Sequence, residues 1–97
     1  MMINGKKIGI WGFGIVGASV MRFLLHNRFG VVPKNISIID QRTLGKTEKA
    51  AIETARVYQY PSSALEQFLE ENDLIIPSAG IDLRPFAAYE HKWLPRS

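Results

Sequence analysis

Cysteine is absent from this sequence, and its absence excludes both a disulfide framework and a thiolate metal site. The two histidines, His26 and His91, lie far apart along the chain, so a structural metal site is not expected. No apolar run approaches the roughly 18 residues that a membrane-spanning helix needs, and the amino terminus lacks the apolar core of a signal peptide. We therefore expect a cytoplasmic protein with no membrane segment.

Clusters of basic residues are also lacking. The formal net charge is +3, but the lysines and arginines are scattered among acidic residues. A sequence-independent grip on nucleic-acid phosphates needs several cations close together, so we expect no nucleic-acid partner. The excess of positive charge instead favours a small anionic ligand.

Apolar runs alternate with helical periodicities along the chain. The 97 residues, 46% hydrophobic and 22% charged, are enough for one domain with a modest core. Strands are expected at 7–11, 36–39, 57–60 and 74–77, and helices at about 15–27, 48–55, 64–71 and from 85 onward. This alternation predicts an α/β fold: a Rossmann-like, doubly wound, mostly parallel sheet of about four strands with flanking helices, in the order 3-2-1-4.

Several helix boundaries carry their own signals. Thr47 is placed to cap the second helix with its hydroxyl. Ser63 and Glu66 have the spacing of a capping box, which predicts the start of the third helix. Pro85 is typical of the first turn of a helix, and this last helix would include Trp93.

The sequence stops after this last helix without a further strand. We therefore expect residues 1–97 to be a single domain from a larger protein. We also expect the outer edge of the fourth strand to be uncovered and open to pairing.

A G-x-G-x-x-G motif spans Gly12 to Gly17 between the first strand and the first helix. Gly12 permits the tight turn, Gly14 lets a ligand approach the backbone, and Gly17 lets the helix pack close to the sheet. The unpaired amides at the start of that helix favour an anion, so a phosphate or diphosphate is the expected ligand. The alternative is that these glycines serve only the turn.

The second predicted strand ends at Asp40, where a dinucleotide-binding fold places its ribose-reading carboxylate. Arg42, two residues later, could pair with phosphate or lie flat against a base. A solvated turn aspartate and a surface arginine are the alternatives. Nearby, Gly45-Lys46-Thr47 resembles the end of a P-loop, but Asp40 occupies the position of the required glycine, so we assign no ATP site to it.

The fourth predicted strand runs into a loop at Ser78, Ala79 and Gly80. Loops that follow strands 1 and 4 of such a sheet face each other across the ligand crevice, so this loop should lie opposite the glycine motif. The alternative is a simple turn that uses glycine for its backbone freedom.

Three segments together resemble the amino-terminal domain of the UDP-N-acetylmuramoyl-L-alanine:D-glutamate ligases of the Mur family. They are Gly-Lys-Lys-Ile-Gly-Ile-Trp-Gly-Phe-Gly-Ile-Val-Gly-Ala-Ser, Ile-Ile-Asp-Gln-Arg, and Asp-Leu-Ile-Ile-Pro-Ser-Ala-Gly-Ile with Arg84-Pro85 following. The resemblance implies a UDP-sugar site, in which the glycine motif contacts uracil and diphosphate. It also implies that Asp40, Gln41 and Arg42 hold the uracil, and that the loop after the fourth strand touches the diphosphate and the muramoyl group.

The predicted UDP-substrate-binding residues are therefore Gly12, Gly14, Ile15, Val16, Gly17, Asp40, Gln41, Arg42, Ser78, Ala79 and Gly80. Two of them depart from the family pattern. The family usually has a hydroxyl residue where this chain has Val16, and its loop reads Ser-Pro-Gly where this chain has Ala79 in the middle. The first departure removes a side-chain phosphate donor, so the loop would depend on its backbone amides.

In that family, ligation in peptidoglycan biosynthesis needs a central domain that binds ATP and magnesium and a carboxy-terminal domain that delivers D-glutamate. Neither domain has a counterpart in these residues, so we predict no catalytic residue, no metal site and no cofactor within this domain.

Two other functions remain open. One is NAD(P) binding in a dehydrogenase or a potassium-channel regulatory protein, with Asp40 reading an adenosine ribose. The other is a non-catalytic interaction module.

Overall fold

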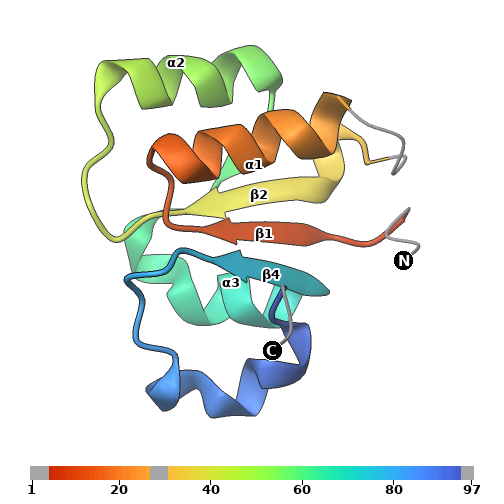
Figure 1. The fold of residues 1–97 in the computed structure, drawn as a ribbon, viewed down its shortest axis with the longest axis vertical. Coiled ribbons are helices and arrows are strands. Elements are labelled where there is room, and N and C mark those ends of the chain that lie inside the picture. The colour runs from red at the N-terminus through yellow and green to blue at the C-terminus, as the bar shows by residue number, and fades with distance from the viewer. Residues whose placement is uncertain (1–4, 27–30, 95–97) are drawn as a thin grey trace.

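The computed structural model describes residues 5–26 and 31–94, which form three layers (Figure 1). The middle layer is a parallel sheet in the order β3-β2-β1-β4. Helices α1 and α2 cover one face, and α3 and η3 cover the other (Figure 1). The elements are β1 Ile8–Trp11, α1 Ile15–His26, η1 Pro33–Asn35, β2 Ile36–Ile39, α2 Lys46–Ala55, β3 Tyr58–Gln59, η2 Ser62–Ala64, α3 Leu65–Glu71, β4 Leu74–Pro77 and η3 Arg84–Lys92.

The predicted fold class and strand order are confirmed. Strand β1 lies between β2 and β4, with Ile8 in register with Ile36 on one side and Leu74 on the other. Every residue of β1 and β2 is buried, as expected for parallel strands covered on both faces. Strand β3 is shorter than predicted, and the predicted end of α1 at about Asn27 lies outside the described residues.

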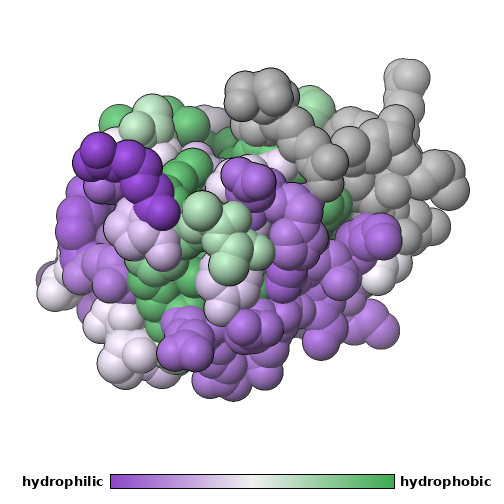
Figure 2. Space-filling view, turned by 90° about the horizontal axis from the view of Figure 1, so that it is seen from below, coloured by the Kyte–Doolittle hydropathy of each residue, from purple (hydrophilic) through white to green (hydrophobic). Residues whose placement is uncertain are grey.

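Two hydrophobic cores hold the layers together. The first lies between the sheet and α1 with α2, and the second lies between the sheet and α3 with η3. Seen from the side of η3, hydrophobic residues show in a central area with hydrophilic residues to its left, to its right and below it (Figure 2). The buried residues are Ile8, Ile10, Phe13, Met21, Leu24, Val31, Ile36, Ile38, Leu44, Ile52 and Val57 in the first core, and Trp11, Ile39, Tyr60, Phe68, Leu69 and Ile75 in the second.

The predicted caps of the second and third helices are wrong. Helix α2 begins at Lys46 with Gly45 as its cap, because the Glu48 carboxylate accepts a hydrogen bond of 3.1 Å from the Gly45 amide. Ser63 lies inside the short helix η2, which begins directly after Pro61 and leads into α3. Since Ser63 is already within a helical turn, it does not occupy the capping position.

The last helix and the edge of the sheet also differ from the prediction. Residues Arg84–Lys92 form a 3₁₀ helix with a kink at Phe86 instead of an α-helix. Trp93 lies beyond its end and forms a parallel bridge with Ile75, and the amide of Leu94 donates to the Ile75 carbonyl at 2.7 Å. The outer edge of β4 is therefore partly paired by the returning chain.

No helix in the described part of the chain is long and apolar enough to cross a membrane.

The close approach of α1 to the sheet depends on Gly17. A β-carbon at this position would lie 2.7 Å from the Gly12 carbonyl oxygen, which belongs to the backbone and cannot move aside. We predict that Gly17→Ala lowers the free energy of unfolding by about 1 to 3 kcal/mol, as overpacking does. Gly80→Ala is the control, because a β-carbon there meets nothing within 4 Å. Urea denaturation should separate the two variants, and equal stability would contradict the packing role.

Candidate functional site

A cleft of about 510 Å³ lies at the carboxyl ends of β1, β2 and β4. Three chain segments meet there: the glycine motif, the residues after β2 and the loop after β4. Ten of the eleven predicted site residues line it, and Ala79 does not. The lining residues are Trp11, Gly12, Gly14, Ile15, Val16, Gly17, Asp40, Gln41, Arg42, Ser78, Gly80 and Ile81.

The glycine motif has the geometry that its spacing predicts. Gly12 has φ +93°, a conformation that other residues rarely adopt, and its amide donates to the Ile39 carbonyl at 2.8 Å. Helix α1 begins at Ile15, and the first amides of a helix have no acceptor within it. The residues of this first turn line the cleft, where the helix dipole favours negative charge.

Asp40 is the most heavily engaged side chain of the cleft. Its Oδ2 accepts hydrogen bonds from the Phe13 amide at 2.8 Å and from Arg42 Nη2 at 3.0 Å. Its Oδ1 accepts from the Arg42 amide at 2.9 Å and from Arg42 Nε at 3.2 Å. The Asp40 side chain is 4% exposed, whereas that of Arg42 is 70% exposed. Two residues that were each predicted to contact a ligand therefore pair with each other, with the carboxylate turned toward the protein and the guanidinium toward solvent.

These contacts set the protonation of the pair. Burial alone would raise the pKa of Asp40, but the hydrogen bonds from Arg42 and Phe13 and the charge of Arg42 together lower it below 3.8. The hydrogen bond and charge of Asp40 raise the pKa of Arg42. Asp40 is therefore negative and Arg42 positive at neutral pH.

Further contacts hold the residue after Asp40 and the loop after β4 in place. Gln41 donates its side-chain amide to the Ser62 carbonyl at 2.7 Å, which ties the end of β2 to the turn before α3. The Ser78 amide donates to the Trp11 carbonyl at 2.8 Å, and the Ile81 amide donates to the Ser78 carbonyl at 3.2 Å. The loop after β4 is thereby fixed against the strand that leads into the glycine motif.

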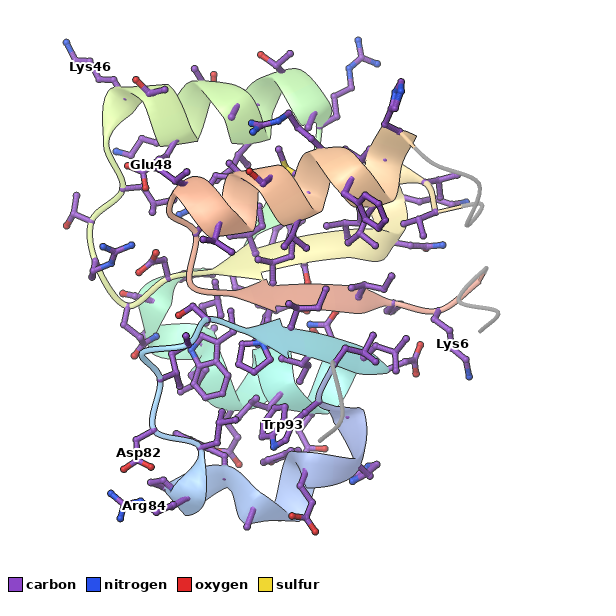
Figure 3. All side chains as sticks on the ribbon, viewed as in Figure 1. Lys6, Lys46, Glu48, Asp82, Arg84 and Trp93 are labelled. Carbon is purple, nitrogen blue, oxygen red and sulfur yellow. The ribbon has the colours of Figure 1, made fainter. Side chains whose placement is uncertain are left out.

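Two residues of the cleft, Trp11 and Ile81, were missed by sequence reasoning. The Trp11 ring packs at 80° against Phe86 with centroids 5.0 Å apart and also contacts Trp93, which Figure 3 labels. Trp11 therefore connects the cleft to the second core. Trp11 directly precedes the glycine motif, and this position could have indicated that it lines the cleft. Side chains of a strand alternate between the two faces of the sheet, however, so the sequence did not determine which face Trp11 occupies.

Arg42 lies where three hollows adjoin. Besides the main cleft, it lines a hollow of about 600 Å³ between the starts of α1 and α2, and one of about 410 Å³ beside Tyr60 and Ser62. Among the residues that line the main cleft, Asp40 and Arg42 are the ionisable ones. The other side chains of the walls include the polar Gln41 and Ser78 and the apolar Ile15 and Val16, of which the last two are 88% and 72% exposed. The arrangement can bind an anion and a flat or apolar group beside it.

The segment Gly45-Lys46-Thr47, which resembles the end of a P-loop, lies at the start of α2. Gly45 caps α2, and the exposed Lys46 side chain extends away from the body of the protein (Figure 3). Lys46 does not line the main cleft.

The lowered pKa of Asp40 predicts an acid-sensitive fold. A carboxyl group whose pKa is lower in the folded chain stabilises the fold above its unfolded pKa, and that contribution is lost as the pH falls through the folded value. We expect the free energy of unfolding to fall more steeply below about pH 4 in the wild type than in Asp40→Asn. Urea denaturation from neutral pH to about pH 2.5 measures this. Identical pH profiles would show that the folded chain does not depress this pKa.

Comparison with known proteins does not assign this chain to a family. No protein-family model matches the sequence, and no curated protein matches it at a significant level.

Proposed function

We propose that this domain binds a UDP-linked sugar in the cleft at the ends of β1, β2 and β4, as the substrate-binding domain of a UDP-N-acetylmuramoyl-L-alanine:D-glutamate ligase in peptidoglycan biosynthesis. One observation carries the proposal. The three segments that bear the resemblance are far apart in sequence, yet they line a single cleft.

The diphosphate would lie against the glycine motif. The first amides of α1 there have no acceptor within the helix, and they attract anions. Arg42 supplies the positive charge of the cleft, and its exposed guanidinium can donate to phosphate oxygens. The backbone amides of this turn and Arg42 are therefore the donors that would hold the diphosphate.

The uridine would lie beside Arg42 and the apolar mouth of the cleft. A planar guanidinium stacks on flat rings, and the exposed side chains of Ile15 and Val16 offer apolar contact. The volume of about 510 Å³ falls in the usual range for small-ligand sites.

A dinucleotide could use the same amides, and NAD(P) binding is the competing function. Reading an adenosine ribose requires carboxylate oxygens that are free to accept hydrogen bonds from its hydroxyls. Both oxygens of Asp40 already accept from protein donors, so a ribose hydroxyl would have to displace one of them. The UDP arrangement proposed above uses the amides of α1 and Arg42 and needs no oxygen of Asp40.

Ligation itself would need ATP, magnesium and D-glutamate, which we assign to domains outside these 97 residues. The domain would then bind substrate without catalysing, in the cytoplasm, where nucleotide-linked precursors are made.

Arg42→Ala tests the charge at the cleft. We expect it to weaken binding of UDP and UDP-N-acetylmuramic acid by roughly 10- to 150-fold, because a hydrogen bond to a charged group is lost. Arg84→Ala is the matched control, since Arg84 pairs with Asp82 in the same way but lies outside the cleft, at the start of η3 (Figure 3). Calorimetry of both variants with the uridine compounds and NADH is the measurement. Tighter binding of NADH, or no effect of Arg42→Ala, would contradict the proposal.

Val16→Thr tests the departure from the family pattern. The substitution places a hydroxyl in the first turn of α1 with almost no change of shape, so we expect UDP to bind a few-fold more tightly. Val32→Thr is the control, because Val32 is also exposed but does not line the cleft. An affinity that is unchanged or weaker in Val16→Thr would place the diphosphate away from this turn.

A further inference from the structure

We infer that Asp40 is a positioning residue of this cleft: its carboxylate fixes the glycine motif and aims Arg42, and it does not itself contact the ligand. The part that concerns ligand binding depends on the proposed function, whereas the part that concerns the loop does not.

The hydrogen bonds of Asp40 leave it little capacity to bind anything else. A carboxylate offers about four acceptor sites. Donors from Phe13 and Arg42 supply four hydrogen bonds to it, between 2.8 and 3.2 Å. The side chain is also 4% exposed. A ligand hydroxyl or ring N–H would have to displace a charge-assisted bond in order to reach it.

The bond to Phe13 reaches the centre of the glycine motif. Phe13 stands between Gly12 and Gly14, and its side chain is fully buried in the first core. Its amide is held by Asp40 at the end of β2, and the neighbouring Gly12 amide is held by Ile39. These two bonds join the end of β2 to the loop after β1, so they determine where the amides of the following helix point.

The bonds to Arg42 orient its guanidinium. Asp40 engages Nε and Nη2, which leaves about three of the five N–H donors of the group unused. Nη2 would lie 3.8 Å from a β-carbon placed on Gly14, so the guanidinium is held beside the glycine motif. Asp40 thus directs both the amides and the charge to the same part of the cleft.

The chain contains a matched comparison. Asp82 pairs with Arg84 through the same three donors, the Arg84 amide, Nε and Nη2, at 2.9 to 3.1 Å. The Asp82 side chain is 54% exposed, and no loop amide is among its hydrogen bonds in the described residues. The pairing of an aspartate with an arginine two residues later is therefore a local motif that occurs twice in the described residues. The additional hydrogen bond from the Phe13 amide distinguishes Asp40 from Asp82.

The loop role is tested in the free protein by NMR. We expect Asp40→Ala to shift the Phe13 amide resonance and to speed its hydrogen exchange at least tenfold, because the amide loses its acceptor. Asp40→Asn keeps one acceptor oxygen and should restore part of the protection, while Asp82→Asn should leave Phe13 unchanged. If Asp40→Ala does not fold, the Phe13 amide of the wild type should still shift as the pH falls through the pKa of Asp40, below 3.8. A Phe13 amide that responds to neither change would overturn the inference.

The ligand role is tested by calorimetry with UDP and inorganic pyrophosphate. Because Asp40 holds the phosphate-binding groups, Asp40→Ala should weaken the binding of pyrophosphate as well as that of UDP, each roughly tenfold or more. The double variant with Arg42→Ala should lose less than the product of the two single losses, since the residues act together. Weaker UDP binding with unchanged pyrophosphate binding would mean that Asp40 reads the uridine, and would refute the inference. Failure of the wild type to bind UDP would refute the proposed function instead, and the NMR result would still decide the loop role.

Discussion

The carboxylate of Asp40 is the contact on which the cleft depends. It lies at the end of β2, and it accepts hydrogen bonds from Phe13 in the loop after β1 and from Arg42 in the loop after β2. Its burial would cost free energy if the charge were unpaired, but the hydrogen bonds and the charge of Arg42 compensate for that loss of solvation. One group therefore joins two loops and keeps a positive charge beside the glycine motif.

The strand order explains why the cleft lies where it does. The chain passes from β1 to β2 on one side of β1, and β4 pairs with β1 on its other side. The loops that follow β1 and β4 therefore run in different directions and leave a crevice between them. Helix α1 begins at this crevice, and its first amides have no acceptor within the helix. Trp11 lines the crevice and packs against Phe86 of η3, so the second core also supports the site.

Much of this could be predicted from the sequence, because the strongest signals are local. The β-branched run at Ile36–Ile39 and the spacing of Gly12, Gly14 and Gly17 each act within a few residues, and the strand order follows from general rules of α/β sheets. The capping of α2 and the partners of Asp40 could not be predicted. Ser63 has a capping sequence but lies inside η2, and the Phe13 amide meets Asp40 only after the strands pair. Likewise, the bridge from Trp93 to Ile75 depends on how η3 kinks.

The central claim is that the cleft at the ends of β1, β2 and β4 binds a UDP-linked sugar. Amide NMR of the isotopically labelled chain, titrated with UDP-N-acetylmuramic acid and separately with NADH, tests it most directly. We predict that the uridine compound shifts the amides of Gly14 to Gly17, Arg42 and Gly80 together, with a single affinity, and that NADH at the same concentration shifts them less. Shifts at these amides with NADH but not with the uridine compound, or shifts confined to other parts of the chain, would contradict it.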